Sequence, residues 1–587
     1  MINYLRKIYY LLGDGQKKIP LIILLFVLSS LFDLAGLSLI APYIGLALDT
    51  NVLDGVFGQI VVRIGLPQEK ESLLLIISLV LLGVFLIKTI SAILINIIII
   101  NFSQNQEVRL RNLLMKSYQS LPYIKYLNRN SSEYIYSIHN LTSQYASHLV
   151  LPLLRTISDS IVGLFILGFL AWQNISALIV LTALIGLLII GYDRIIRHRV
   201  TIHGAKANKS ATRMVEGIHE GIEGLKEIRI LGKERYFGKI VSDSAEKFSF
   251  YNKRIQVLTG IPRYLLELTM IMFIVLLVIS TLLLEGNLHE LMPTIGVFSV
   301  AALRLFPSAN MLSTSLVHLR HGHDAVNRLY SDVKEYEQFK PEKLEKNSEI
   351  SEEEFQRITL DAISFVYPNT SQKSLKQISL EIRAGESIGI IGASGSGKTT
   401  LIDLLLGLLD PQDGVINYNG KPLNLFMRQW QSQVAYLSQQ VFLIDDTLRQ
   451  NVTLAIDADK INEKLLHKAL QQSRLMELVD QLPQGIDTVL GERGMRLSGG
   501  QRQRVALARA FYRERGVLIM DEATSALDNK TEREIVKEIE QLKGRKTMIV
   551  IAHRLTTLQY CDRIYELKDG EIIGVGNYKE LVLNYKT

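Results

Sequence analysis

Six apolar runs occupy the first 320 residues, and they constrain the fold more than any other feature of the chain. The runs extend over residues 19–48, 73–100, 149–170, 177–192, 259–284 and 291–314. Most of them exceed the roughly 20 residues that a helix needs to cross about 30 Å of hydrocarbon at 1.5 Å per residue. The sequence therefore predicts six transmembrane helices, of which the fourth is the shortest.

Charges beside these runs predict how the helices are oriented. Basic residues such as Arg6 and Lys18 precede the first run, whereas the turn between the third and fourth runs carries no charge. The positive-inside rule then places the N-terminus, and the long connections 103–148 and 193–258, in the cytoplasm. The first run is too long for a signal-peptide core and is expected to remain as an uncleaved anchor.

Composition excludes two other classes of protein. The formal net charge of +7 is explained by basic residues in the predicted cytoplasmic connections, so we do not expect a nucleic-acid partner. The single cysteine, Cys561, excludes an intrachain disulfide and a metal cluster held by several thiolates.

The C-terminal half contains a phosphate-binding motif in its expected structural context. A strand-like run, 387–391, leads into Gly-x-x-x-x-Gly-Lys-Thr over 392–399, and a helical pattern follows. Backbone N–H groups of such a loop surround phosphates, the lysine reaches the β- and γ-phosphates, and the threonine offers an oxygen to Mg²⁺. The predicted nucleotide contacts are Gly392, Ser394, Gly395, Ser396, Gly397, Lys398, Thr399 and Thr400.

A second apolar strand, 517–520, ends in Asp521 and Glu522. We expect Asp521 to hold the Mg²⁺ shell. Glu522 follows directly and could polarise an attacking water as a general base.

The motif that narrows the class is Leu-Ser-Gly-Gly-Gln at 497–501, which ends 20 residues before Asp521. With this motif the sequence resembles the ATP-binding cassette (ABC) family, whose signature has these letters at this place. Other motifs of the family match in order along the chain. They are Tyr367, Gln439, the run 491–494, Asp528 in the run 525–528, and His553.

This resemblance implies an ABC-type ATPase that uses ATP and Mg²⁺. The implied catalytic residues are Glu522, His553 and Gln439, and the implied metal ligands are Thr399, Gln439 and Asp521. Nucleotide contacts beyond the loop are implied for Tyr367, Ser498, Gly499, Gly500, Gln501 and Asp528. In the family the signature meets a phosphate bound by the opposite subunit. Because the chain has one cassette, the resemblance implies a homodimer with two composite sites.

The whole chain resembles the half-transporter arrangement of ABC exporters. The predicted fold is an α-helical six-span transmembrane domain fused to an α/β P-loop ABC nucleotide-binding domain. The expected boundaries are 1–324 for the membrane domain, 325–350 for a charged linker and 351–587 for the cytoplasmic ATP-binding domain. By position, the family's coupling helices are expected near 121–134 and 213–224.

Ionisable residues inside the apolar runs are candidates for substrate binding, because each costs about 2.5 to 3.5 kcal/mol to insert. Two i, i+4 pairs, Arg155 with Asp159 and Arg263 with Glu267, can neutralise themselves along one helix. Asp33, Lys88 and Arg304 have no such neighbour and leave one spare positive charge per chain. This spare charge predicts a basic cavity that would bind a substrate with an anionic headgroup. The alternative is that Asp33 pairs with Lys88 and ties the first two helices together.

A further resemblance concerns the substrate. The stretch 302–310, together with Arg263 and Glu267, looks like bacterial flippases for lipid-linked oligosaccharides, as does an expected external amphipathic helix over 56–64. This implies flipping of a polyprenyl-pyrophosphate glycan across the inner membrane for protein glycosylation. Arg263 and Arg304 would face the pyrophosphate. The alternatives are a lipid A or multidrug exporter, and a membrane-bound ATP switch that transports nothing.

Overall fold

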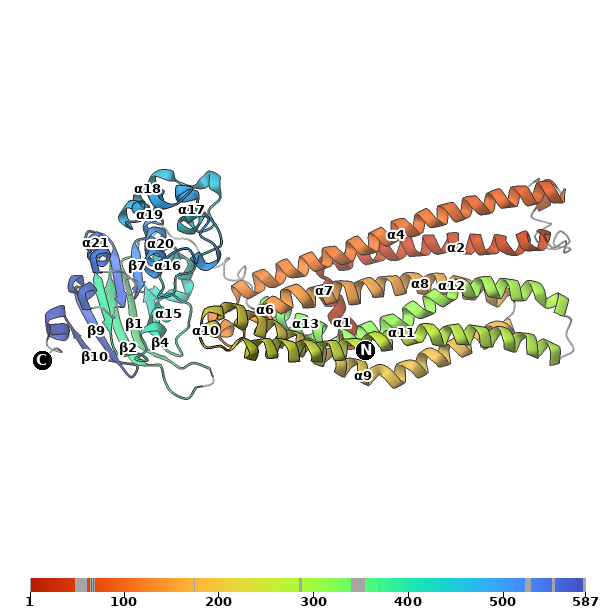
Figure 1. Cartoon of the computed structure of the whole chain (residues 1–587), viewed down its shortest axis with the longest axis horizontal. Helices are drawn as coiled ribbons and strands as arrows, with labels where there is room; N and C mark the ends of the chain where they lie inside the picture. The colour runs from red at the N-terminus through yellow and green to blue at the C-terminus, as the bar shows by residue number, and fades with distance from the viewer. Residues whose placement is uncertain are drawn as a thin grey trace. The chain divides into compact units, whose positions relative to one another are not determined.

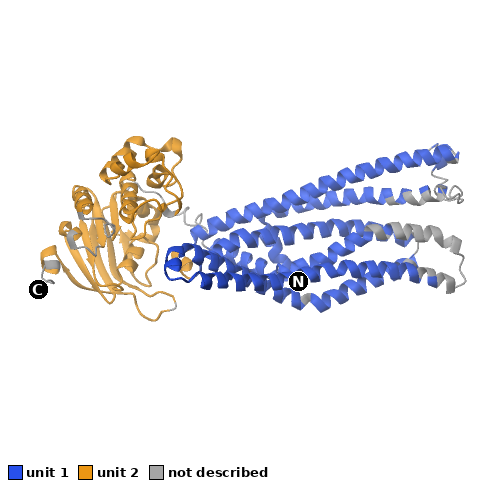
Figure 2. Ribbon diagram, in the orientation of Figure 1, with its two compact units in different colours: residues 1–121, 129–340 blue, residues 122–128, 341–587 orange. Residues whose placement is uncertain are grey.

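The computed structural model describes most of the chain. It covers residues 2–47, 61–63, 65, 67, 69–173, 175–283, 288–338, 354–368, 370–522, 529–551 and 555–583. The chain divides into two compact units, coloured separately in Figure 2. Unit 1 comprises Met1–Leu121 and Arg129–Lys340, and unit 2 comprises Pro122–Asn128 and Pro341–Thr587.

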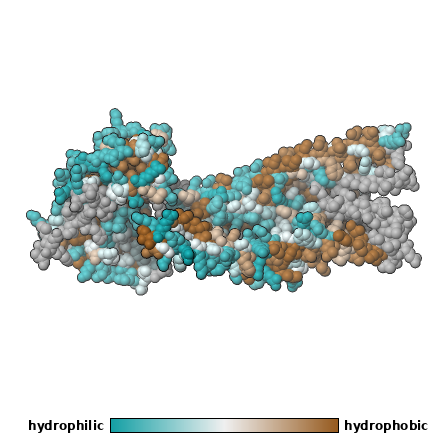
Figure 3. All heavy atoms as spheres, in the orientation of Figure 1, coloured by the Kyte–Doolittle hydropathy of each residue, from teal (hydrophilic) through white to brown (hydrophobic). Residues whose placement is uncertain are grey.

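Unit 1 is built of long helices that run side by side (Figure 1). They are α2 (Ile19–Ala47), α4 (Lys70–Ser120), α8 (Leu151–Gln173), α9 (Ile175–Glu223), α11 (Glu234–Leu283) and α12 (Leu288–His321). Brown, hydrophobic atoms cover parts of their surface in Figure 3, and teal, hydrophilic atoms cover others. Five stretches among the described residues are long and apolar enough to cross a membrane. The sixth predicted span, 291–314, lies on α12 and stays a prediction.

Three of these helices are far longer than a membrane is thick. At 1.5 Å per residue, the 51 residues of α4 extend over about 75 Å, more than twice the hydrocarbon core. α9 and α11 have 49 and 50 residues. The polar part of each of these helices adjoins its apolar run directly, after the run in α4 and α9 and before it in α11, so each helix continues beyond the membrane without a break.

Short helices fill the polar end of unit 1. They are α1 (Ile2–Leu12), η1 (Gly13–Lys18), α6 (Ser131–Tyr136), η3 (Ser137–Leu141), α7 (Thr142–Tyr145), η4 (Ala146–Val150), α10 (Leu225–Ile230) and α13 (His323–Gln338). In α1, Ile8, Leu11 and Leu12 are buried while Leu5 and Tyr9 are exposed. One face of this N-terminal helix therefore packs on the unit and the other remains free.

The predicted linker is wrong over its first half. Residues 325–338 belong to helix α13, whose Ala325, Val326, Leu329 and Val333 are buried in the core of unit 1. Their i, i+3, i+4 spacing forms an apolar stripe that the abundance of charged residues concealed. Unit 1 consequently ends at Lys340 rather than at residue 324.

The cytoplasmic turns differ in how well the sequence placed them. The short helix α5 (Tyr123–Leu127) lies inside the predicted range and packs with unit 2. The second turn was expected over 213–224, but α9 continues to Glu223 and α10 begins after Gly224. Of the predicted external helix over 56–64, only 61–63 are described, and these are helical.

Unit 2 contains two sheets and confirms the predicted α/β class. The four-stranded antiparallel sheet has the order β2-β1-β4-β5, and the six-stranded sheet has the order β10-β9-β3-β8-β7-β6. The strands are β1 (Arg357–Phe365), β2 (Leu375–Arg383), β3 (Ser387–Ile391), β4 (Asp413–Tyr418), β5 (Lys421–Pro422), β6 (Val434–Leu437), β7 (Val517–Asp521), β8 (Thr547–Ile551), β9 (Arg563–Lys568) and β10 (Glu571–Gly576).

Helices surround both sheets. The main ones are α15 (Lys398–Leu405), α16 (Met427–Gln433), α17 (Leu448–Thr453), α18 (Glu463–Gln472), α19 (Met476–Gln481), α20 (Gly499–Tyr512) and α21 (Asn529–Glu540). Strands β6, β7, β8, β3 and β9 pair in parallel. Their carboxyl ends therefore meet at one edge of the sheet, where α/β proteins bind their ligands.

Candidate functional site

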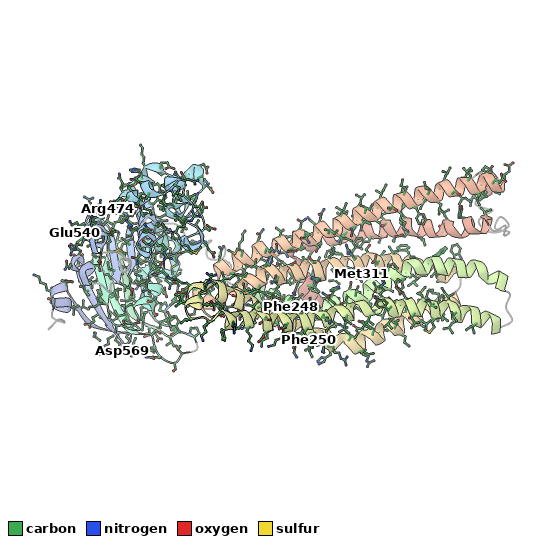
Figure 4. All side chains as sticks on the ribbon, in the orientation of Figure 1. Phe248, Phe250, Met311, Arg474, Glu540 and Asp569 are labelled. Atoms are coloured by element: carbon green, nitrogen blue, oxygen red, sulfur yellow. The ribbon has the colours of Figure 1, made fainter. Side chains whose placement is uncertain are left out.

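A pocket of about 720 Å³ lies at this edge of the six-stranded sheet. Its lining includes Tyr367, Ser394, Gly395, Gly397, Lys398, Thr399, Thr400, Gln439, Asp521 and Glu522. These residues follow β1, β3, β6 and β7. Asp569, labelled in Figure 4, and Gly570 complete the wall from the turn between β9 and β10. The fold thus brings together side chains that lie up to about 200 residues apart in the sequence.

The phosphate loop adopts a conformation that only glycine permits at its tightest points. A Cβ atom on Gly392 would lie 2.2 Å from the carbonyl oxygen of Leu567, and one on Gly397 would lie 2.7 Å from that of Ser374. Gly397 also has φ +104°, in the left-handed region. Its neighbour Lys398 begins helix α15, so the loop presents its N–H groups at a helix N-terminus.

The Lys398 ammonium and the Ser396 hydroxyl are the two polar groups of the loop that are available to bind phosphate. Lys398 Nζ donates to the carbonyl oxygens of Gly392 and Ala393, at 2.8 and 2.9 Å. Burial lowers the pKa of this ammonium, while the nearby Glu522 and Asp521 act in the opposite direction. The Ser396 hydroxyl is buried and has no hydrogen-bond partner among the described residues. Phosphate oxygens would satisfy both groups.

Gln439 and Glu522, which are 83 residues apart, are in direct contact. Gln439 Nε2 donates to Glu522 Oε2 at 2.7 Å. The Glu522 backbone has φ +51°, which is uncommon for a residue other than glycine. Two hydrogen bonds hold it there, from Glu522 N to the Ile551 oxygen at 3.0 Å and from Gln503 Nε2 to the Glu522 oxygen at 3.4 Å. This backbone turns the carboxylate into the pocket.

The residues present fit a magnesium ion. Thr399, Gln439 and Asp521 all line the pocket and offer hydroxyl, amide and carboxylate oxygens, the ligand types that Mg²⁺ prefers. Tyr436 supports this group, because its hydroxyl donates to Asp521 Oδ2 at 3.5 Å.

Tyr367, which the family resemblance predicts to stack on the nucleotide base, lines the pocket. Its hydroxyl lies 3.2 Å from Thr400 Oγ1, and its ring packs edge to face on Phe365 with centroids 5.0 Å apart. Both contacts fix the ring relative to the phosphate loop, so that a flat apolar surface borders the cavity.

The signature forms a well-capped helix start outside this pocket. Ser498 caps α20: its hydroxyl accepts from Gln501 N at 3.2 Å, and Gln501 Oε1 accepts from Ser498 N at 2.8 Å. Ser498 and Gly499 are exposed. None of the described residues 497–501 lines the pocket of their own chain. Two other predicted site residues, Asp528 and His553, lie outside the described residues, and their roles stay predictions.

Sequence reasoning missed a carboxylate beneath the phosphate loop. Asp403, one helical turn after Thr399 on α15, has its pKa raised to about 6 by burial and by the charge of Asp521. Tyr123 of α5 lies close enough to Asp403 for that charge to raise the tyrosine pKa, after burial as the main cause. A carboxylate on the otherwise apolar stretch 401–405 was the available signal.

The predicted substrate residues in unit 1 do not form a basic cavity in the described part of the chain. Lys88 Nζ forms an ion pair with Asp33 at 2.9 Å, and the two side chains are 16% and 5% exposed. Lys88 is therefore not a spare charge, and the alternative of a tie between α2 and α4 is confirmed. Arg263 pairs with Glu267 at 3.2 Å, as its spacing predicted. The Arg304 side chain lies outside the described residues.

A membrane domain of long helices fused to a P-loop domain with this site defines an ATP-driven membrane transporter. The family models agree: residues 19–302 match the ABC transporter transmembrane region and residues 375–525 match the ABC transporter domain. The chain belongs to the ABC transporter family and is an exporter half-transporter.

Similar proteins cover between 76% and 98% of the chain. An ATP-dependent lipid A-core flippase of Cupriavidus metallidurans is 31% identical over 76% of this chain and 73% of its own length. The flippase of the same name from Sodalis glossinidius is 27% identical over 98% and 95%. A solved bacterial Atm1-family ABC exporter with ATP bound shares the fold, with a TM-score of 0.78 and 21% identity over 97% of both chains.

Proposed function

We propose that two copies of this chain form an ATP-driven flippase that moves a lipid A-type glycolipid across the bacterial inner membrane. The observation that carries the proposal is the similarity to proteins named lipid A-core flippases, which extends through the membrane domain to 98% of the chain. The pocket in unit 2, with the loop, Gln439, Asp521 and Glu522 together, supports the ATP-driven step.

In this proposal ATP binding changes the partners of two side chains. Lys398 leaves the carbonyl oxygens of its own loop and binds phosphate oxygens, and Ser396 gains an acceptor. Thr399, Gln439 and Asp521 would hold Mg²⁺, which neutralises charge on the phosphates. Glu522 then accepts a proton from the attacking water, once Gln439 has released its carboxylate oxygen. His553 assists at the γ-phosphate, as the family resemblance implies.

The proposed homodimer follows from the exposed signature. Ser498 caps helix α20, and Gly499 and Gly500 begin it with N–H groups that have no partner within the helix and with a favourable dipole, yet none of the three lines the pocket of its own chain. A second copy would bring its signature to the pocket of the first. Each dimer would then have two equivalent sites that hydrolyse ATP.

A polyprenyl-pyrophosphate oligosaccharide is the second candidate substrate. It rests on the resemblance over 302–310. The pairing of Lys88 and of Arg263 with acids removes two of the three charges proposed to attract a pyrophosphate. The proposal of a lipid A-type substrate does not depend on those charges.

Reconstitution tests the choice between substrates. The purified protein, in liposomes with ATP and Mg²⁺, should translocate labelled lipid A and should lose this activity in Glu522→Gln. Translocation of a labelled polyprenyl-pyrophosphate oligosaccharide but not of lipid A would replace the proposal with the second candidate. ATP hydrolysis indifferent to both lipids, with neither translocated, would contradict both.

A further inference from the structure

A second pocket lies in unit 1, far along the sequence from the ATP site. It has a volume of about 400 Å³ and is formed by α1, α9, α12 and α13. Its polar lining comprises Tyr4, Arg194, His198, Thr201, Arg320 and His323, and leucines of α12 supply the rest. Five of these six polar side chains can donate hydrogen bonds through a cationic, imidazole or phenol group, and none is acidic.

The pocket lies where helix α9 leaves the hydrocarbon. The apolar run of this helix ends at Tyr192, and the candidate span extends over Leu178–Ile196. Arg194, His198 and Thr201 follow at i, i+4 and i+7, so they line one face of the helix just past the run. By the predicted orientation, this level is the cytoplasmic surface of the membrane.

Apolar side chains precede Arg194 on the same face of α9. Ile190 and Leu187, four and seven residues before it, are 67% and 78% exposed. These side chains face lipid in a membrane-spanning helix. A molecule whose head enters the pocket therefore meets an apolar surface for its tail within two helical turns.

One cation in the pocket is already neutralised. Arg320 forms an ion pair with Asp193, and its Nη1 also donates to the Asp193 carbonyl oxygen at 3.1 Å. Arg320 is only 10% exposed, so these contacts fix its guanidinium. Arg320 therefore lines the pocket as a fixed side chain whose charge Asp193 neutralises.

The other wall is held by hydrogen bonds of the N-terminal helix. Tyr4 Oη donates to the Leu319 carbonyl oxygen at 2.7 Å, and the rings of Tyr4 and His323 lie 5.0 Å apart. The Asn327 amide donates to His323 Nδ1 at 3.0 Å, which leaves the ring proton on Nε2. His323 is thereby set as a hydrogen-bond donor.

Arg194 and His198 have no such constraint. Both are exposed, and no ion pair involves either of them in the part of the chain that the structure describes. The charges of Arg320 and Asp193 cancel, so the pocket has a net positive charge that comes from Arg194. A guanidinium at the membrane surface, next to fixed donors and exposed apolar side chains, suits a phosphate that carries lipid tails.

We propose that this pocket binds the phosphate headgroup of a lipid in the cytoplasmic leaflet, with Arg194 as its main charged contact and His198 and His323 as donors. The proposal goes beyond the transport function, because the bound lipid need not be the one transported. Neither Lys88 nor Arg263 lines the pocket, and the proposed binding needs no ATP.

Binding of short-chain lipids to the detergent-solubilised full-length protein tests this site. Dihexanoyl phosphatidic acid should bind, and Arg194→Gln should weaken that binding about tenfold, the effect of losing one charge-assisted contact. Arg194→Lys should recover part of the affinity. The matched control is Arg199→Gln, an exposed arginine of the same helix that does not line the pocket, and it should change affinity less than about twofold.

Three results would overturn the proposal. Equal losses in Arg194→Gln and Arg199→Gln would show that general surface charge, not the pocket, binds the lipid. Equal affinity for dihexanoyl phosphatidylcholine, in which choline balances the phosphate charge, would show that the pocket does not recognise an anionic headgroup. Equal affinity for inorganic phosphate would assign the site to a free anion rather than a lipid. A failure of lipid A translocation alongside intact lipid binding would contradict only the transport function.

Discussion

Polar residues serve different purposes in the two units. In unit 2, Gln439 and Glu522 come from the ends of separate strands and meet at 2.7 Å in an open pocket. In unit 1, Asp33 and Lys88 also come from separate helices and meet, but Asp33 is buried, Lys88 is mostly covered, and the two neutralise each other. A polar residue with a sequence motif therefore indicates chemistry in the cassette, whereas a lone charge in an apolar run indicates a partner on the next helix.

The pair in unit 1 offers the largest expected effect on stability. Removing one partner of a buried ion pair leaves an uncompensated charge and costs about 3 kcal/mol or more. Lys88→Met and Asp33→Asn should therefore each lower the thermal unfolding midpoint in detergent clearly. The double variant should recover most of the loss. Additive losses in the double variant would show that the two side chains do not act as a pair.

The catalytic side of the comparison rests on Glu522. Glu522→Gln keeps the size of the side chain and its contact with Gln439 but removes the base. We expect ATP turnover to fall at least about 100-fold, while binding of a labelled ATP analogue stays within a few fold. Turnover near that of the wild type would contradict the assignment.

Two variants at Tyr367 distinguish the contribution of ring stacking to ATP binding from that of the hydroxyl. Tyr367→Ala should raise the Kd for ATP about tenfold, because base stacking on an aromatic ring contributes roughly 1 to 3 kcal/mol. Tyr367→Phe keeps the ring and loses only the contact with Thr400, so it should bind nearly as the wild type does. A loss in Tyr367→Phe equal to that in Tyr367→Ala would assign the role to the hydroxyl.

Asp403 predicts a pH dependence of stability. Its folded pKa, about 6, lies above the usual 3.8, so the folded state binds the proton more tightly than the unfolded state. The contribution of this group to stability is therefore largest below pH 4 and declines as pH rises through 6. Asp403→Asn should stabilise the protein at pH 7.5 by about 1 kcal/mol and flatten that decline. An unchanged profile of unfolding midpoint against pH would contradict the shift.

The smallest effect is expected at Arg263. Arg263 lies four residues into the predicted span 259–284, close enough to its cytoplasmic start for the guanidinium to reach water, and its pair with Glu267 is 65% and 47% exposed. An ion pair that reaches water contributes less than about 1 kcal/mol. Arg263→Gln should leave the unfolding midpoint almost unchanged, in contrast to Lys88→Met. A loss as large as that of Lys88→Met would mean that the two pairs are equivalent.

The ATP-binding domain could be predicted in detail because its functional residues are grouped in short motifs of adjacent residues. The loop 392–399, the signature 497–501 and Asp521 with Glu522 are short motifs of neighbouring residues, and residues of the loop line one pocket together with Asp521 and Glu522. Asp403 escaped notice because its role comes from burial under the loop, and burial has no short motif.

The membrane unit was predictable in its class but not in its contacts. Hydropathy marks helices, since each must satisfy its own backbone in lipid. The partner of a charge such as Lys88 depends on which helices are neighbours, and a single sequence does not state this. For the same reason α13 was read as a linker: its apolar stripe becomes visible only against the core that buries it.

Mixing two inactive variants tests most directly whether this chain is one half of an ATP-driven transporter. Lys398→Ala disables the loop and Ser498→Arg disables the signature, so each homodimer should lack ATPase activity. A heterodimer purified through two different tags combines both defects in one composite site and leaves the other site intact. It should regain about half of the wild-type ATPase activity. An inactive heterodimer, beside an active doubly tagged wild type, would contradict the shared site.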